Sequence, residues 1–298
     1  MHPRIVLRAG AVLALAFMLA APPPAAAKVK VVASLTDLGS IAAAVGGDQI
    51  EVTAVARPAS DAHRVEVLPS YMVRVSHAQL YLKVGLGLDQ WADQIIDGSR
   101  NGKLEVLDCA HHIEPLDKPG GRVDASLGDV HPDGNPHYWL DPRNGALVAR
   151  DIAEALAGLD PAHADDFRRR AEAFARKCVA SQTAAAATVA ALPVKTVITY
   201  HSSWVYFAHA TGLEIAGTVE PVPGIPPTAR HLQELVGLIR EQQVPVVLQE
   251  PYFSNEAPAF LAREAGVRVA MVSASCDDVT PDSYLTHFNH VVELIAGR

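Results

Sequence analysis

The sequence has 298 residues, of which 49% are hydrophobic, and its formal net charge at pH 7 is −8. This apolar content is enough for buried cores, so we expect a globular protein. The acidic balance argues against nucleic acid or an anionic lipid surface as a partner and favours a cation.

The N-terminus has the features of a secretory signal peptide over residues 1–27. Arg4 and Arg8 precede an apolar run at 9–21, and a cluster of prolines and alanines follows. The run is shorter than the ~20 apolar residues of a membrane span, so we expect it to be cleaved off. Loss of the two arginines would change the charge from −8 to −10. Because no cysteine follows the run to carry a lipid, we expect a soluble periplasmic protein.

Alternating strands and helices fill residues 28–145, the predicted N-terminal lobe. Runs rich in β-branched residues predict strands, and apolar residues at helical spacing predict helices. The strands are expected at 28–34, 50–56, 80–84 and 104–107, and the helices at 35–45, 68–76 and 88–96. This alternation predicts an α/β lobe with a mainly parallel sheet.

A helical connection follows over 146–192. We expect one helix at 146–158 and a second from Pro161 to about Leu192. The second is expected to be continuous because residues 162–192 contain no glycine or proline. The second helix is longer than the average of ~11 to 12 residues. We therefore expect a rigid helix that runs along the molecule and joins two lobes.

The alternating pattern returns over 193–298, the predicted C-terminal lobe. The strands are expected at 196–199, 213–217, 246–248 and 267–273, and the helices at 204–210, 229–242, 256–265 and 284–296. The sequence thus predicts a two-lobed α/β protein. Its ligand would bind in a cleft outside the carboxyl ends of the strands.

Three histidines lie in turn-rich loops after predicted strands: His63, His137 and His201. The ends of parallel strands meet at one edge of a sheet, so these side chains could converge on the cleft. Neutral imidazole is the commonest protein ligand for zinc. Taken singly, each histidine could also be a turn or surface residue, since no pair has ligand spacing on one helix.

Carboxylates after other strands could complete the site. We expect the fourth ligand to be Asp277, with Asp278 as the alternative, because both follow the last predicted strand. Three imidazoles and one carboxylate complete a zinc tetrahedron, whereas Mn²⁺ prefers more carboxylates. Glu250 is expected to lie behind the ligands and accept the second ring N–H of a histidine.

The remaining candidates carry less weight. The chain has three cysteines, Cys109, Cys178 and Cys276, so at most one disulfide could form within it. No two of them have metal-site spacing, so a cysteine zinc site is not expected. His111 and His112 are expected to form a surface pair. The sequence leaves open whether they, or His131, form an accessory metal site.

Several of these segments resemble the zinc- and manganese-specific substrate-binding proteins of ABC importers. Residues 135–142 are similar to the family's Asn-Pro-His-x-Trp-Leu-Asp-Pro, and residues 200–208, 224–228 and 84–88 resemble further motifs of that family. The resemblance extends over nearly all of the mature chain. It implies two four-stranded lobes, a rigid connecting helix, and metal ligands at His63, His137 and His201.

The chain departs from that family at two positions near the expected site. Ala62 stands where the family usually has a proline before the first ligand. Residues 128–134 contain one histidine, His131, where many zinc members carry a long histidine-rich loop. A loop that gathers zinc is therefore absent or reduced to His131.

The resemblance implies a periplasmic, high-affinity zinc-binding protein that delivers Zn²⁺ to the membrane permease of an ABC importer and is not an enzyme. A manganese-binding homologue is the alternative. From other classes, a zinc-dependent hydrolase would need an open coordination position and a base such as Glu250, and an adhesin would use the same fold with a structural metal. We expect a monomer that binds no nucleic acid, with a periplasmic metallochaperone as a further candidate partner.

Overall fold

The structure is a computed structural model that describes residues 27–121 and 128–298. Residues 1–26, which make up nearly all of the predicted signal peptide, lie outside the described residues. Among the helices of the described ranges, none has the length and apolarity needed to cross a membrane.

The first lobe is built on a parallel sheet with the strand order β2-β1-β3-β4. The central strands β1 and β3 are mostly buried, as expected for a parallel sheet with helices on its faces, whereas β4 is an exposed edge. The strands are β1 Val29–Ala33, β2 Ile50–Ala54, β3 Leu80–Lys83 and β4 Glu105–Asp108, and the helices are α1 Thr36–Gly46, α2 Pro69–Ser76 and α3 Trp91–Ser99.

The second lobe repeats this arrangement with a parallel sheet of strand order β6-β5-β7-β8. Strand β7 is buried at all four residues. The strands are β5 Thr196–Thr199, β6 Glu214–Thr218, β7 Val246–Gln249 and β8 Arg268–Met271, and the helices are α6 Val205–Thr211, α7 Ala229–Gln242, α8 Glu256–Ala265 and α9 Ser283–Ile295. The predicted fold class, two lobes with four parallel strands each, is confirmed.

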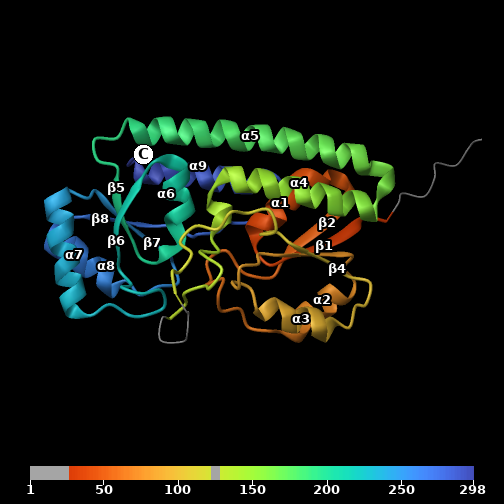
Figure 1. Ribbon diagram of the computed structural model, residues 1–298, viewed down its shortest axis with the longest axis horizontal. Coiled ribbons are helices and arrows are strands. Elements are labelled where there is room, and N and C mark those ends of the chain that lie inside the picture. Colours follow the sequence, from red (N-terminus) through yellow and green to blue (C-terminus); the bar gives the residue numbers. More distant parts are fainter. Residues whose placement is uncertain (1–26, 122–127) are drawn as a thin grey trace, which may run out of the picture.

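Two long helices pack against each other, and of the two α5 runs over both lobes while α4 lies over the first (Figure 1). Helix α4, Pro142–Leu159, begins earlier than the sequence pattern predicts, because the Asp141 side chain accepts a hydrogen bond from the Arg143 backbone N–H and Pro142 occupies the first turn. Helix α5, Ala164–Ala190, has 27 residues and so a length of about 40 Å at 1.5 Å per residue. It packs against α1 of the first lobe and α6 of the second. The predicted long helix joining the lobes is confirmed.

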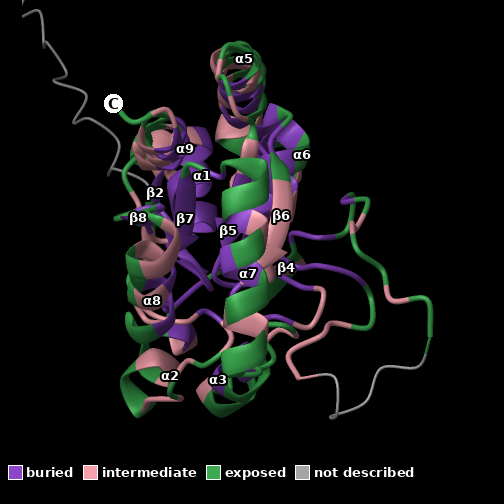
Figure 2. Cartoon of the chain, turned by 90° about the vertical axis from the view of Figure 1, so that its left-hand side faces the viewer, coloured by how far each residue is buried: buried purple, intermediate pink, exposed green. Residues whose placement is uncertain are grey.

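The lobes share a hydrophobic core that runs from β1 to α9. The C-terminal helix α9 reaches back to the first lobe, where the Tyr284 hydroxyl donates to the backbone carbonyl of Trp139 at 2.6 Å. A smaller core lies beneath α7 and α8, whose outer faces are exposed (Figure 2). The two sheets are therefore tied together by side-chain packing as well as by the chain.

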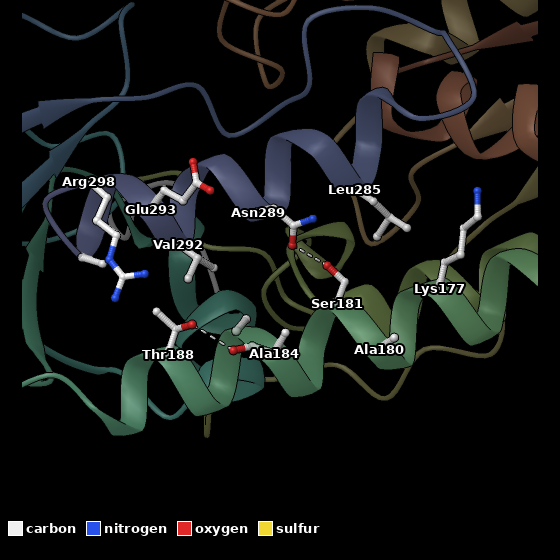
Figure 3. Close-up of a pocket in the computed structure, with 12 residues that line it drawn as sticks. Lys177, Ala180, Ser181, Ala184, Thr188, Leu285, Asn289, Val292, Glu293 and Arg298 are labelled. Carbon is white, nitrogen blue, oxygen red and sulfur yellow. Dashed lines mark hydrogen bonds between the residues drawn. The ribbon is translucent and has the colours of Figure 1, made fainter.

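A cavity of about 540 Å³ lies between α5 and α9 (Figure 3). Its lining includes Lys177, Glu293 and Arg298 and contains no histidine or cysteine. It therefore offers no set of histidine or cysteine ligands for a metal ion.

Candidate metal site

Three histidine side chains converge between the two lobes. His63, His137 and His201 each offer one ring nitrogen, and these three atoms lie within 4.8 Å of one another. The ring centroids are 5.2 to 5.5 Å apart, so the rings form a nearly equilateral triangle. The convergence predicted from the strand ends is what the structure shows.

His63 is held in the loop after β2 by the aspartate two residues before it. The Asp61 side chain accepts both the backbone N–H and the ring Nδ1–H of His63, each at 2.9 Å. The carbonyl of Ala62 accepts from the indole N–H of Trp91 at 2.9 Å, and Ala62 is buried. This hydrogen bond restrains the loop at the position where the related family has a proline.

His137 is held by an asparagine in the same way. The Asn135 side-chain oxygen accepts the backbone N–H of His137 at 3.0 Å and its ring Nδ1–H at 2.9 Å. The Asn135 amide donates to the carbonyl of Ser202 at 2.8 Å, next to the third histidine. Trp139 packs against the His137 ring at a centroid distance of 5.2 Å. Both lobes thus fix the position of His137.

His201 follows β5 and is paired with a carboxylate from the end of β6. Its Nδ1 lies 2.7 Å from Glu220 Oε2, and the same oxygen accepts the backbone N–H of Gly224 at 3.0 Å. Both side chains of this pair are buried, with exposures of 5% and 7%. The carboxylate orients the imidazole and balances positive charge at the site.

The three hydrogen bonds leave the same ring nitrogen free on each histidine. When Nδ1 donates to an oxygen, the ring is in the tautomer whose Nε2 carries a lone pair. His63 Nε2 is buried and has no hydrogen-bond partner in the described structure. The arrangement is that of ligand imidazoles oriented by carboxylate or amide acceptors behind them.

The electrostatics at His137 favour a neutral ring. Burial, together with the neighbouring histidines, holds the pKa of His137 well below its usual value. Burial raises the pKa of Asp61, but its contacts with His63 outweigh that effect and lower it overall. A neutral imidazole is the protonation state that binds a metal cation.

The space around the triad suits an ion rather than an organic substrate. Two small cavities of about 150 and 230 Å³ adjoin it, and His201 and Asp129 line both. Pockets for organic ligands usually measure ~300 to 1,000 Å³. The other lining residues include His137, Asn135 and Pro223 in the first cavity, and His63, Glu220 and Phe253 in the second.

Neither predicted aspartate belongs to the triad. Asp277 and Asp278 are exposed, and the Asp278 side chain accepts the backbone N–H of Thr280 at 2.8 Å. Strand β8 ends at Met271, and the carbonyl of Ala274 accepts the indole N–H of Trp139 at 2.8 Å. The chain after β8 therefore contacts the first lobe at Ala274, and by Asp277 and Asp278 it has reached the surface.

The role expected of Glu250 is taken by Glu220. Glu250 is fully buried, but its Oε1 accepts from the indole N–H of Trp204 at 3.1 Å and its Oε2 has no partner. Burial raises the pKa of Glu250 to about 8. In the described structure this carboxyl orients an indole and makes no hydrogen bond with a ligand imidazole.

The surface histidine pair and the three cysteines are not part of the triad. His111 and His112 have ring centroids 4.6 Å apart at the surface, where His112 Nδ1 pairs with Asp151 at 2.9 Å. Cys109, Cys178 and Cys276 are buried and unpaired. Across the described residues, His63, His137 and His201 form the one group of three or more possible ligand side chains.

Sequence reasoning missed the residues behind the ligands. Asp61 and Asn135 each stand two residues before a histidine, a spacing at which an Asx side chain can accept the backbone N–H that follows. That signal was present in the sequence. Glu220, two residues beyond β6, carried no local signal, because its pairing with His201 depends on strands β5 and β6 lying side by side.

Comparison with known proteins agrees with this geometry. The family model for the periplasmic component A of the zinc-uptake complex matches residues 31–297. The iron-binding protein YfeA of Yersinia pestis is 27% identical over 92% of this chain and 88% of its own length. The high-affinity zinc uptake system protein ZnuA of Brucella abortus is 26% identical over 75% of this chain and 77% of its own.

A solved structure shares the fold. The crystal structure of a zinc-bound ZnuA deletion mutant superposes with a TM-score of 0.79 at 27% identity, covering 90% of this chain and 97% of that one. The names of these relatives refer to different metals, zinc and iron.

Proposed function

The chain belongs to the family of periplasmic components A of zinc-uptake complexes, and we propose that it captures one Zn²⁺ ion at His63, His137 and His201 and delivers it to an ABC importer. Members of this family are metal-binding solute-binding proteins of ABC transporters, not enzymes. The finer assignments, which are the metal, the ligands and the periplasmic location, are our proposals. The observation that carries them is the convergence of three imidazoles with Nδ1 fixed and Nε2 free.

The donor set favours zinc over Mn²⁺. Imidazole nitrogens suit Zn²⁺, while Mn²⁺ is favoured by more oxygen ligands and a higher coordination number. The two carboxylates nearest the triad, Asp61 and Glu220, are already engaged by ring N–H groups. A manganese-binding protein remains the alternative and would require these carboxylates to turn towards the ion.

The triad needs only a small contraction to hold zinc. Nitrogen ligands of tetrahedral zinc lie ~2.1 Å from the ion and so about 3.4 Å from one another. The nitrogens are at most 4.8 Å apart, so closing the triangle to that spacing moves each atom by at most about 0.8 Å towards the centre. Rotation of side chains can supply this movement without a large change in the lobes.

Delivery requires that the ion can leave the site. Its ligands come from loops at the strand ends of both lobes, so loosening of those loops opens the shell. We propose that the protein acts as a monomer against the importer permease, with a metallochaperone as a further candidate donor of zinc.

Metal competition on the purified mature chain tests the proposal. Apo protein equilibrated with equal concentrations of Zn²⁺, Mn²⁺ and Fe²⁺, then desalted without oxygen, is expected to retain about one zinc per chain by elemental analysis. The His137→Ala variant should retain none, while His111→Ala, which changes a surface histidine, should behave as the unmodified protein. Retention of manganese or iron in preference to zinc would overturn the metal assignment.

A further inference from the structure

Three imidazoles leave a tetrahedral zinc ion one ligand short. Asp61 and Glu220 accept ring N–H groups of ligand histidines, so using either as a ligand would break a hydrogen bond that orients the site. Asp277 and Asp278 are exposed and outside the triad. None of these four carboxylates is a free fourth donor, and Asp129, which lines both cavities beside the triad, accepts a hydrogen bond from Arg64 at 3.4 Å.

A fourth histidine stands beside the triad. The ring centroid of His131 is 5.3 Å from that of His63, and His131 lines the same small cavity as His137 and His201. Its Nε2 is buried and has no hydrogen-bond partner among the residues that the structure describes. Buried polar atoms without a partner are rare in folded proteins and call for an explanation such as a bound ion.

The two ring nitrogens of His131 have different surroundings. Nδ1 lies beside the chain at Gly87, where an added Cβ would be 3.4 Å from it. Nε2 is buried and has no partner among the described residues. The nitrogen that remains free is again Nε2.

The loop that carries His131 is attached to both lobes. The Asp129 backbone N–H donates to the carbonyl of Pro223 at 2.8 Å, and the Asp129 side chain accepts from Arg64 at 3.4 Å. The backbone N–H of Gly134 donates to the His131 carbonyl at 3.2 Å. These contacts hold His131 next to the loop of His63.

We propose that His131 is the fourth zinc ligand, so that the metal is bound by four imidazoles. The inference rests on the proposed function, because it assigns the remaining coordination position of that same site. Its ring lies outside the group whose ligand atoms are within 4.8 Å, so it joins the shell by a side-chain movement when the ion binds. The site would then carry the full 2+ charge of the ion, balanced by Asp61 and Glu220 behind the ligands.

The test compares zinc coordination and affinity in the full mature chain, in His131→Ala, and in the surface control His111→Ala. X-ray absorption at the zinc edge is expected to show four imidazole ligands in the unmodified protein and three in His131→Ala. Zinc affinity, measured by competition with a chromogenic chelator, should fall at least about tenfold in His131→Ala, the lower end of what loss of a supporting residue costs at metal sites. His111→Ala should change neither reading.

Each outcome decides between the inference and the function on which it rests. Three imidazoles in the unmodified protein, or equal affinities for the unmodified protein and His131→Ala, would overturn the inference and leave zinc binding intact. An unmodified protein that retains no zinc would overturn the proposed function and the inference with it. Circular dichroism and the melting temperature of metal-free His131→Ala show whether that variant folds. If it does not fold, His131→Gln, which keeps a polar side chain but lacks an imidazole, replaces it and is expected to show the same loss of zinc affinity.

Discussion

The carboxylate behind His201 offers a sharp test of how the site is built. Glu220 Oε2 accepts from both the His201 ring and the Gly224 backbone, and Glu220 is almost fully buried. Glu220→Ala leaves the buried ring N–H without an acceptor and frees the imidazole to turn. Glu220→Gln keeps an oxygen that can accept the hydrogen bond but removes the negative charge.

The expected losses follow from these two effects. Residues that orient a metal ligand typically contribute 10- to 100-fold to affinity. We expect Glu220→Gln to weaken zinc binding about tenfold and Glu220→Ala about 100-fold, which correspond to about 1.4 and 2.7 kcal/mol. The alanine variant loses more because both the charge and the acceptor are gone.

The assay is zinc competition against a chromogenic chelator at pH 7.5, with Glu250→Gln as the matched control. Glu250 is an equally buried glutamate that hydrogen-bonds Trp204 and no ligand. Its variant should bind zinc as the unmodified protein does. Affinity of Glu220→Ala within twofold of the unmodified protein, or an equal loss in Glu250→Gln, would refute the reasoning.

Four further predictions concern stability, shape and the acidic pair. Burial raises the pKa of Glu250 to about 8 from 4.5, so its contribution to stability is complete below about pH 4.5 and is lost progressively as pH rises from 4.5 to 8. Glu250→Gln should therefore raise the free energy of unfolding of the metal-free protein by about 3 kcal/mol at pH 7 and by little at pH 4.5. Urea unfolding that shows the same difference at both pH values would contradict this. Zinc at a thousandfold excess over Kd should add about 4 kcal/mol and raise the melting temperature by about 8 to 16 °C, an increase that calorimetry should not find in His137→Ala. Because α5 packs on both lobes and contains no glycine or proline, small-angle scattering should give nearly the same radius of gyration with and without zinc, and a large compaction would argue against a rigid helix. Asp277→Ala and Asp278→Ala should both leave zinc affinity unchanged, since both side chains are exposed, and a loss in either would return that aspartate to the ligand set.

Much of the fold was readable from the sequence because its signals are local. Short apolar strands alternate with amphipathic helices at a spacing that permits little but parallel sheets. The long helix α5 followed from an uninterrupted stretch rich in alanine and arginine. Element ends were less certain, as at α4, whose start depends on a side-chain cap at Asp141.

The sequence also indicated the three histidines whose rings the structure brings together. His63 and His201 follow β2 and β5, whereas His137 lies far beyond the end of β4 at Asp108 and was indicated by the motif of residues 135–142. The sequence could not place the fourth ligand or the carboxylate behind His201. Asp277 and Asp278 follow a strand as two of the histidines do, but β8 ends at Met271 and the chain has turned to the surface by the time it reaches them.

Only the tertiary structure decided which acceptor serves which ligand. The pairing of His201 with Glu220 depends on two neighbouring strands, and the approach of His131 to His63 depends on a loop attached to both lobes. These residues are 19 and 68 positions apart in the chain. Sequence periodicity reports which face of an element is buried, whereas contacts between loops are set by the packing of whole lobes, and that information is not local to any segment.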